Sequence, residues 1–170
     1  MIMISQLISL LGLGAVLGLY PAAMGLLIQQ PIPPDTLITL RRPDCFLSCP
    51  HYLLTISADG TVTFEGFKNV RVKGKVQTQI SREKVQLLVN AFMKAKYFSL
   101  RDEYIWQKDG CRKVWPDSSS ATTSILINGK SKSVEHYLGC RGKGKTSYPE
   151  SLTKLERMID ELANTSQWID

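Results

Sequence analysis

HYLLTISADGTVTFE, residues 51–65, decides the fold of this chain. In its first half, apolar residues fall on every second position, which is the period of a strand with one buried face. Asp59-Gly60 then reverses the chain, because glycine readily takes the positive φ of a tight turn. Thr61–Glu65 forms the returning strand. The stretch therefore predicts a β-hairpin, and antiparallel pairing is the starting point for the fold.

A second hairpin is predicted from Asn128-Gly129, the dipeptide that best favours a type I′ turn. It would join a strand at Thr123–Ile127 to one at Lys132–His136. Two further strands are expected at Ile38–Leu40 and Val70–Val76. The strands are therefore connected mainly as hairpins, without crossover units.

The predicted strand at Val70–Val76 has two different faces. One carries the valines and Gly74, and the other carries three cations, Arg71, Lys73 and Lys75. A row of cations on a strand is typical of a solvated face or a protected sheet edge. Because no aromatic residues are interleaved with them, they do not indicate nucleic-acid binding.

Two helices are predicted from caps and periodicity. The first has Ser81 as its N-cap and Glu83 in its first turn. Its apolar residues recur at i, i+3, i+4 and i+7, at Val85, Leu88, Val89 and Phe92. The second opens with the capping-box spacing of Ser147-Tyr148-Pro149-Glu150. Its buried face would consist of Leu152, Leu155, Ile159 and Leu162.

The order of these elements, strands, helix, strands, helix, predicts an α+β fold. We expect an antiparallel sheet of about five to six strands with two helices packed on one face. An N-terminal apolar helix would precede it, because Ile2–Ile28 is almost wholly apolar and long enough to cross a bilayer. The first charged residue is Asp35, so the whole net charge of +6 falls in residues 35–170.

We therefore expect three segments. Residues 1–28 would be a signal-anchor or a signal peptide, with Leu7–Leu19 as the apolar stretch of the latter, and both alternatives remain open. Residues 29–36 would be a proline-rich linker and 37–170 a single α+β domain. If the first segment is not cleaved, the membrane is its partner.

Four cysteines, Cys45, Cys49, Cys111 and Cys140, indicate an exported protein with disulfides. We favour the pairs Cys45–Cys49 and Cys111–Cys140. A turn through Leu47-Ser48 would bring the first two thiols together, since an extended chain would hold them too far apart. The second bridge would fasten the long segment that precedes Ser120. Crossed pairings remain open, because loop entropy alone would favour them.

A zinc site is the alternative for the same residues. Cys45-x3-Cys49 and His136-x3-Cys140 together form a Cys3His set at ligand-like spacing. The usual Cys-x2-Cys knuckle is absent, and an exported protein would oxidise its thiols first. We therefore expect no metal and no other cofactor.

Residues 104–120 form a long segment without clear periodicity. It carries Tyr104, Trp106, Trp115 and Asp117, which together with His136 could line a ligand-binding face. Aromatic residues in such a segment also serve to cover the open side of a small sheet. A segment of this length is usually functional or tied down.

Gly139–Thr146, GCRGKGKT, matches the pattern of a phosphate-binding loop. That chemistry needs a helix beginning at Lys145-Thr146, but Pro149 would break such a helix within one turn. An acidic residue for magnesium and a βαβ order are also missing. We interpret the segment as a surface loop and expect no nucleotide partner.

The run Cys45-Phe46-Leu47-Ser48-Cys49-Pro50-His51-Tyr52 resembles the opening of a family of unknown function found in bacterial exported proteins and lipoproteins. That family's opening has a Cys-Phe-Gly-x-Cys-Pro-x-Tyr-like pattern, and Leu47 stands where the family tends to have glycine. Similarity continues at Asp59–Val62, Asp102–Tyr104 and Val134–Cys140 and covers roughly residues 37–163. The resemblance implies an exported α+β domain and carries no activity.

The expected function is that of an exported or membrane-anchored, non-catalytic binding or accessory module. The alternative is an extracytoplasmic enzyme, a hydrolase or a zinc-dependent one, that uses the Cys/His cluster or the segment at 104–120. In both cases the protein would work in the periplasm, at the outer side of a membrane, or as a secreted molecule.

Overall fold

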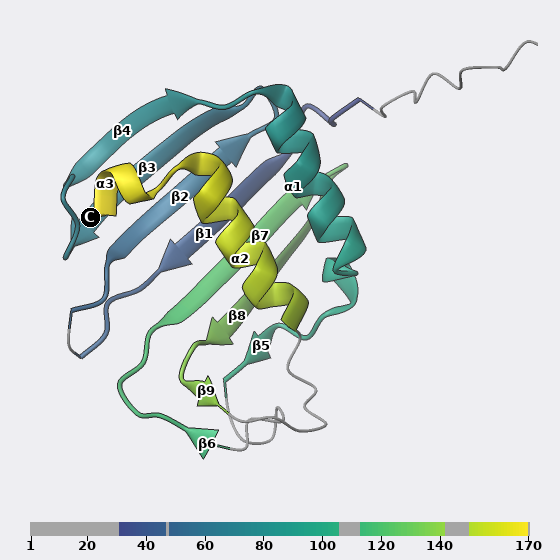
Figure 1. Ribbon diagram of the computed structural model, residues 1–170. Helices are drawn as coiled ribbons and strands as arrows, with labels where there is room; N and C mark the ends of the chain where they lie inside the picture. The colour runs from purple at the N-terminus through teal and green to yellow at the C-terminus, as the bar shows by residue number, and fades with distance from the viewer. Residues whose placement is uncertain (1–30, 47, 106–112, 142–149, 170) are drawn as a thin grey trace, which may run out of the picture. The chain divides into compact units, whose positions relative to one another are not determined.

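The computed structural model describes residues 31–46, 48–105, 113–141 and 150–169 (Figure 1). They form a seven-stranded sheet of order β4-β3-β2-β1-β7-β8-β5, with helices against one of its faces (Figure 1). A separate two-stranded sheet joins β6 to β9. The strands are β1 Leu37–Arg42, β2 His51–Ser57, β3 Thr61–Lys68, β4 Gly74–Gln79, β5 Glu103–Tyr104, β6 Lys113–Val114, β7 Ser120–Ile127, β8 Lys130–Tyr137 and β9 Cys140–Arg141. The helices are α1 Arg82–Lys94, the 3-10 helix η1 Tyr97–Ser99, α2 Glu150–Ala163 and α3 Ser166–Ile169.

The predicted hairpin at 51–65 is confirmed as β2 and β3, which pair antiparallel. Gly60 has a φ of 90°, and a Cβ at this position would lie 2.2 Å from the carbonyl oxygen of Ile80. Asp59 accepts a hydrogen bond from the backbone N–H of Thr61 at 2.9 Å, which fixes the turn. Local sequence therefore sets this hairpin.

The hairpin at Asn128-Gly129 is also confirmed, and it joins β7 to β8. Both turn residues have positive φ, 51° and 70°. The carboxylate of Asp35 accepts hydrogen bonds from the backbone N–H groups of Asn128, at 3.0 Å, and Gly129, at 2.6 Å. β1 lies between β2 and β7 and thereby merges the two hairpins into one sheet.

Asp35 gives the turn a pH dependence. Its backbone hydrogen bond from Gly129, followed by that from Asn128, lowers the pKa of the carboxyl group below its ordinary value of 3.8. The unfolded chain lacks these bonds, so the stabilisation is present above about pH 4 and is lost as pH falls through the folded-state pKa. We expect Asp35→Asn to lower the urea midpoint at neutral pH and to flatten its decline in acid. Asp117→Asn, at an exposed carboxylate, is the control, and an Asp35→Asn profile parallel to that of the wild type would contradict this role.

The sheet differs from the expectation in two respects. It has seven strands, more than the predicted five to six, and β5 pairs parallel to β8, so the sheet is not wholly antiparallel. β5 contains only two residues, too few for a hydrophobic period to reveal it. It follows η1 along the chain, and the N–H of Glu135 in β8 donates to the carbonyl of Asp102 directly before it at 2.8 Å.

The strand predicted at Val70–Val76 begins later, at Gly74, and continues to Gln79. Residues 70–73 form a bend that passes close over β3, where a Cβ on Gly66 would lie 2.0 Å from the carbonyl oxygen of Val72. This close approach explains why glycine occupies position 66. The bend is held from the other side as well, since the N–H of Val72 donates to the carbonyl of Trp168 in α3.

Helix α1 forms as predicted, with Ser81 as its N-cap and with Val85, Leu88, Val89 and Phe92 buried. The buried face of α2 is correct for Leu152, Leu155 and Ile159. Leu162 is only partly buried but packs against the core, and the prediction missed Glu156 and Ala163, which are buried. The predicted cap at Ser147 lies outside the described residues.

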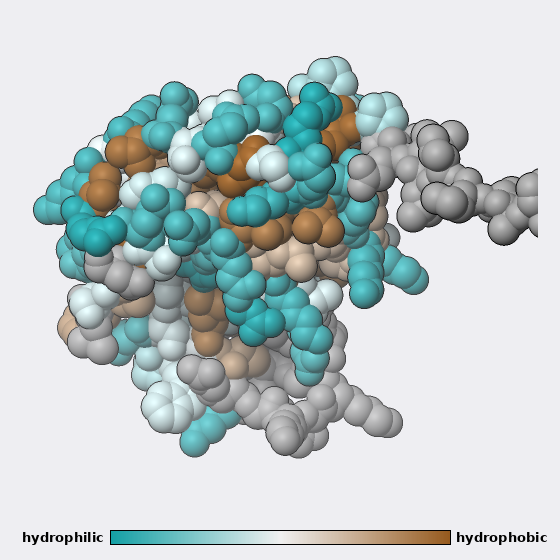
Figure 2. Space-filling view, turned by 45° about the horizontal axis from the view of Figure 1, so that its top comes forward, coloured by the Kyte–Doolittle hydropathy of each residue, from teal (hydrophilic) through white to brown (hydrophobic). Residues whose placement is uncertain are grey.

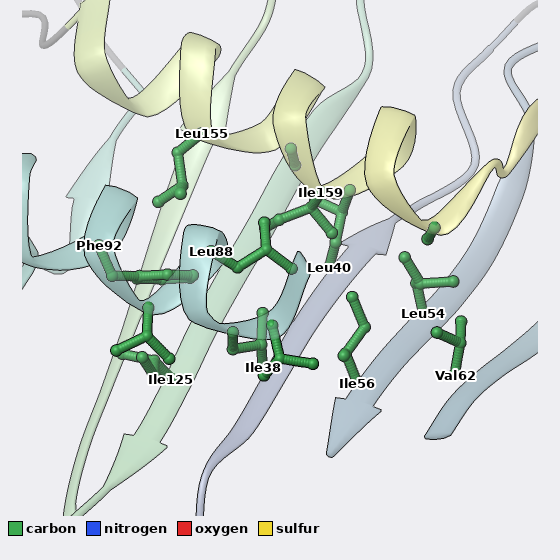
Figure 3. Close-up of a cluster of buried hydrophobic side chains, with 14 of the residues drawn as sticks. Ile38, Leu40, Leu54, Ile56, Val62, Leu88, Phe92, Ile125, Leu155 and Ile159 are labelled. Carbon is green, nitrogen blue, oxygen red and sulfur yellow. The ribbon is translucent and has the colours of Figure 1, made fainter. Parts of the chain in front are cut away.

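The hydrophobic core lies between the sheet and the helices, as Figure 3 shows. Burial of each large apolar side chain contributes about 1.5–3 kcal/mol relative to exposure. α1 and α2 thus cover the helix-facing side of the sheet with side chains that include Ile38, Leu40, Leu54, Ile56, Val62, Leu88, Phe92, Ile125, Leu155 and Ile159.

Within the part of the chain that the structure describes, no helix is long and apolar enough to cross a membrane. The apolar helix predicted for residues 1–28 lies outside this part and stays a prediction. Of the predicted linker, residues 31–36 contact the domain: Ile32 and Thr36 are buried, and Asp35 binds the β7–β8 turn.

Candidate functional site

The register of the sheet places a row of polar side chains beneath α2. Tyr104 in β5 lies opposite His136 in β8, and His136 lies opposite Ala121 in β7. The register pairs Arg41 of β1 with Thr122 of β7, one position away from Arg42 and Ala121, and Arg42 lies opposite Tyr52 in β2. Residues far apart in the sequence therefore share one line across five strands, and the small Ala121 stands at its centre.

Helix α2 adds two carboxylates to this row, one turn apart. Glu156 Oε1 lies 2.7 Å from His136 Nδ1, and these side chains are only 2% and 3% exposed. Asp160 accepts from Arg42 Nη2 at 2.8 Å and from the Tyr52 hydroxyl at 2.7 Å. Both carboxylates thus bind residues of the sheet.

The hydroxyl of Thr165 also donates to Asp160, at 2.9 Å. We call Arg42, Tyr52, His136, Glu156, Asp160 and Thr165 the α2 polar cluster.

The protonation of two cluster residues follows from their surroundings. Burial raises the pKa of the Tyr52 hydroxyl, and the negative charge of Asp160 raises it further. Burial opposes the charge of Arg42, but the attraction of Asp160, Tyr52 and Glu156 and the hydrogen bond to Asp160 together outweigh it and raise the guanidinium pKa. Tyr52 therefore remains a neutral donor and Arg42 a cation at physiological pH.

The geometry of the cluster favours a structural role over chemistry. A carboxylate that holds an imidazole is a common orienting pair in catalytic sites. In this structure both side chains are buried, so neither presents an atom to a substrate in solvent. The hydrogen bonds of Asp160 are likewise made within the domain. The cluster fastens α2 to β1, β2 and β8.

The residues predicted to form a ligand-binding face do not share one surface. Tyr104 and His136 are neighbours in the interior, and the Tyr104 hydroxyl accepts from the backbone N–H of Arg101. Trp115 is 54% exposed, and Asp117 is exposed with a φ of 61°. Trp106 lies outside the described residues. The structure thus separates this set into a buried pair and two surface residues.

Cys45 and Cys49 form a disulfide, with 2.06 Å between the sulfurs and 5.5 Å between the Cα atoms. The N–H of Cys49 donates to the Cys45 sulfur at 3.1 Å. Cys140 is also disulfide-bonded. Cys111 lies outside the described residues, so its pairing with Cys140 stays a prediction.

The alternative zinc set is not assembled in the oxidised protein. Two of its sulfurs, those of Cys45 and Cys49, are bonded to each other, and His136 contacts Glu156 through Nδ1. Across residues 31–46, 48–105, 113–141 and 150–169, no group of three His, Cys, Asp or Glu side chains could hold a metal ion.

The glycine that begins the Gly139–Thr146 segment is required by a close approach of two parts of the chain. A Cβ at Gly139 would lie 2.5 Å from the carbonyl oxygen of Trp115, so glycine permits the close approach of the two chains. The carbonyl of Gly139 accepts from the N–H of Trp115, and Cys140–Arg141 pairs with β6 as strand β9. Residues 142–149 lie outside the described residues.

Sequence reasoning missed a groove between α1 and α2. It encloses about 350 Å³ and is lined by Ala91, Lys94, Ala95, Ser151, Lys154, Leu155 and Met158. Figure 2 shows hydrophobic atoms exposed among hydrophilic ones on this side of the domain. The available signal was the exposed apolar residues outside each predicted buried face, of which Met158 is 36% exposed.

The fold and these features define a class: a two-layer α+β domain with an internally paired polar cluster and an open groove between its helices. The chain belongs to a family described as a domain of unknown function, DUF6438, whose model matches residues 36–163. This confirms the predicted membership of an uncharacterised family. Among curated proteins, none matches the chain.

Proposed function

We propose that the protein is an extracytoplasmic, non-catalytic binding module, and that the groove between α1 and α2 binds a small amphipathic anion such as an alkyl carboxylate. The observation that carries this proposal is the groove itself. Its volume of about 350 Å³ falls in the range of small-molecule sites, which are mainly apolar with a few polar groups.

The lining of the groove supports an anion with an apolar tail. Ala91 of α1, Ala95 at its C-cap, and Leu155 and Met158 of α2 provide an apolar surface. Lys94 projects from one helix and Lys154 from the other, so that a negative group between them would meet two cations.

Both lysines are available for such a ligand. Lys154 has only a loose contact with Glu150, at 3.8 Å, and both of these side chains are largely exposed. Lys94 has no ion pair among the described residues. A surface pair as long and exposed as that of Lys154 contributes little, so an arriving anion displaces it easily.

The proposed location rests on three observations of different kinds. A disulfide between Cys45 and Cys49 suits an oxidising compartment. Residues 1–28 have the composition of a targeting or anchoring segment. The family resemblance implies export. Catalysis receives less support, since the His136–Glu156 pair is buried away from solvent.

The test is a calorimetric titration of the full chain and its variants with octanoate and with octanol. All titrations use the same medium, so that partition of the ligand into the medium affects the wild type and the variants equally. We expect Ala91→Trp, which fills the groove, to abolish octanoate binding. Met93→Trp is the matched control, because Met93 lies on the same helix, is 46% exposed and does not line the groove. Equal binding by Ala91→Trp and wild type would refute the proposed site.

The charge of the ligand is tested by Lys94→Gln/Lys154→Gln. Two exposed ion contacts worth about 0.2–1 kcal/mol each predict a loss of octanoate affinity of about two- to thirtyfold, with octanol unchanged. Lys84→Gln removes an exposed lysine of α1 that is outside the groove and serves as the control. A parallel loss for octanol would contradict recognition of the anion.

A further inference from the structure

One end of the sheet carries exposed aromatic residues that the core does not use. Phe46, in the β1–β2 connection, is 83% exposed, and Phe67, near the end of β3, is 44% exposed. The β1–β2 and β3–β4 connections lie at the same end of the sheet (Figure 1). With Lys68, Arg71 and Lys73, these two rings form what we call the aromatic-cationic end.

The two connections are fastened to each other. Asp44 accepts from the Cys45 N–H at 3.1 Å and from Lys68 Nζ at 2.6 Å. The amide of Asn69 donates to the Cys49 carbonyl at 3.2 Å. The Cys45–Cys49 disulfide closes the loop that holds Phe46. Phe46 is thus presented on a constrained loop, which lowers the entropy cost of placing its ring in an interface.

The charges at this end are mostly positive. In the bend at 70–73, Val70 and Val72 pack against the core, whereas Arg71 and Lys73 are exposed. In the described part of the chain, neither of these two cations has an ion pair. Among the described residues of the two connections, Lys68, Arg71 and Lys73 stand against one carboxylate, Asp44, an excess of two positive charges (three minus one).

We propose that the aromatic-cationic end docks on a membrane surface that contains anionic phospholipid. Aromatic rings favour the level of the lipid headgroups, and nearby arginine and lysine are attracted to anionic headgroups. Phe46 enters the interface, while Arg71 and Lys73 contact phosphates. This surface lies on the strand connections, apart from the groove between α1 and α2, and the inference goes beyond the proposed ligand binding.

A lipid surface fits these observations better than a protein partner does. An aromatic hot spot in a protein complex needs a matching pocket on the partner. Here that pocket would have to form around a single projecting ring. A fluid interface accepts such a ring without a preformed pocket. The unpaired cations beside it match the negative potential of anionic lipids and need no specific partner residue.

The test places a reporter at the end itself, because the apolar residues 1–28 could hold the full chain on any vesicle. Phe46→Trp is compared with wild type in phosphatidylcholine vesicles that contain or lack phosphatidylglycerol. The difference in emission between Phe46→Trp and wild type reports on the tryptophan at 46. We expect this emission to shift to shorter wavelength and to be quenched by brominated lipid, and we expect both changes only in vesicles that contain phosphatidylglycerol. Leu87→Trp, at a 54% exposed position of α1, is the control and should show neither change.

The contribution of charge is tested in the Phe46→Trp background. Arg71→Gln/Lys73→Gln should weaken the phosphatidylglycerol-dependent response about tenfold or more, and added salt should suppress it. Lys84→Gln/Lys130→Gln removes the same charge at exposed positions outside both proposed surfaces and should leave the response intact. If the tryptophan at 46 keeps the emission of a solvent-exposed tryptophan with every type of vesicle, the proposal is overturned. Cross-linking of position 46 to a protein would then assign the aromatic-cationic end to a protein partner. An equal response on neutral vesicles overturns it as well.

Discussion

Replacing Glu156 with alanine is expected to destabilise the folded domain by about 1–3 kcal/mol, as is typical when one partner of a buried hydrogen bond is removed. The substitution takes away the carboxylate that lies 2.7 Å from His136 Nδ1, in a place where neither side chain is more than 3% exposed. Because domains are stable by only about 5–15 kcal/mol, the loss would be evident in urea unfolding.

Two comparisons make this prediction specific. Glu161→Ala, on the same helix but 67% exposed in its loose pair with Arg157, should change the free energy of unfolding by less than about 0.5 kcal/mol. His136→Leu/Glu156→Leu should be less destabilised than the sum of its single variants, because it removes both ends of the hydrogen bond between them. An alanine variant within about 1 kcal/mol of wild type would show that the pair does not fasten α2.

Ile159→Ala is expected to cost about 2–5 kcal/mol, the range for deleting a fully buried aliphatic side chain. Ile159 is fully buried on α2, where it points toward the sheet among the side chains of the core (Figure 3). The core is close-packed, so the deletion loses both the transfer free energy and the contacts around the resulting cavity. Chemical denaturation gives the difference directly.

The neighbouring position provides the control. Met158→Ala removes a similar volume, but Met158 is 36% exposed and lines the groove. Its cost in stability should stay below about 1 kcal/mol, while octanoate affinity should fall. If the two variants were equally destabilised, α2 would not have the orientation described. If Met158→Ala bound octanoate as wild type does, the proposed groove ligand would be wrong.

Elements with strong local signals were predictable. Asp59-Gly60 and Asn128-Gly129 specify their turns through positive φ, and the alternation of the flanking strands specifies which face is buried. The i, i+3, i+4, i+7 pattern of α1 gave its whole buried face. These predictions succeed because neighbours in the sequence carry the information.

Elements that depend on distant partners were not predictable in the same way. β5 exists because β8 lies beside it, and a two-residue strand has no period of its own. The strand after Val70 starts only at Gly74, because the bend must first cross Gly66. On α2, the apolar pattern did not include Glu156, because a carboxylate is rarely buried without a partner and that partner comes from the distant strand β8.

The candidate sites, too, contain residues that the sequence indicates and residues that only the tertiary structure brings together. His136 was notable in the sequence, but its partner Glu156 was not, because only the packing of α2 on β8 brings the two together. The groove arises from the spacing of two helices, a distance that neither helix encodes alone. The exposure of Phe46 likewise depends on which side of its loop faces the core.

By itself, the sequence determined the α+β class, both hairpins, the face of α1 and the membership of an uncharacterised family, because turns and periodicities are local properties of the chain. Only the tertiary structure decided the seven-strand order, the polar cluster under α2 and the two surfaces proposed for binding. These depend on the free energy of contacts between distant residues, which exist only once the sheet has assembled.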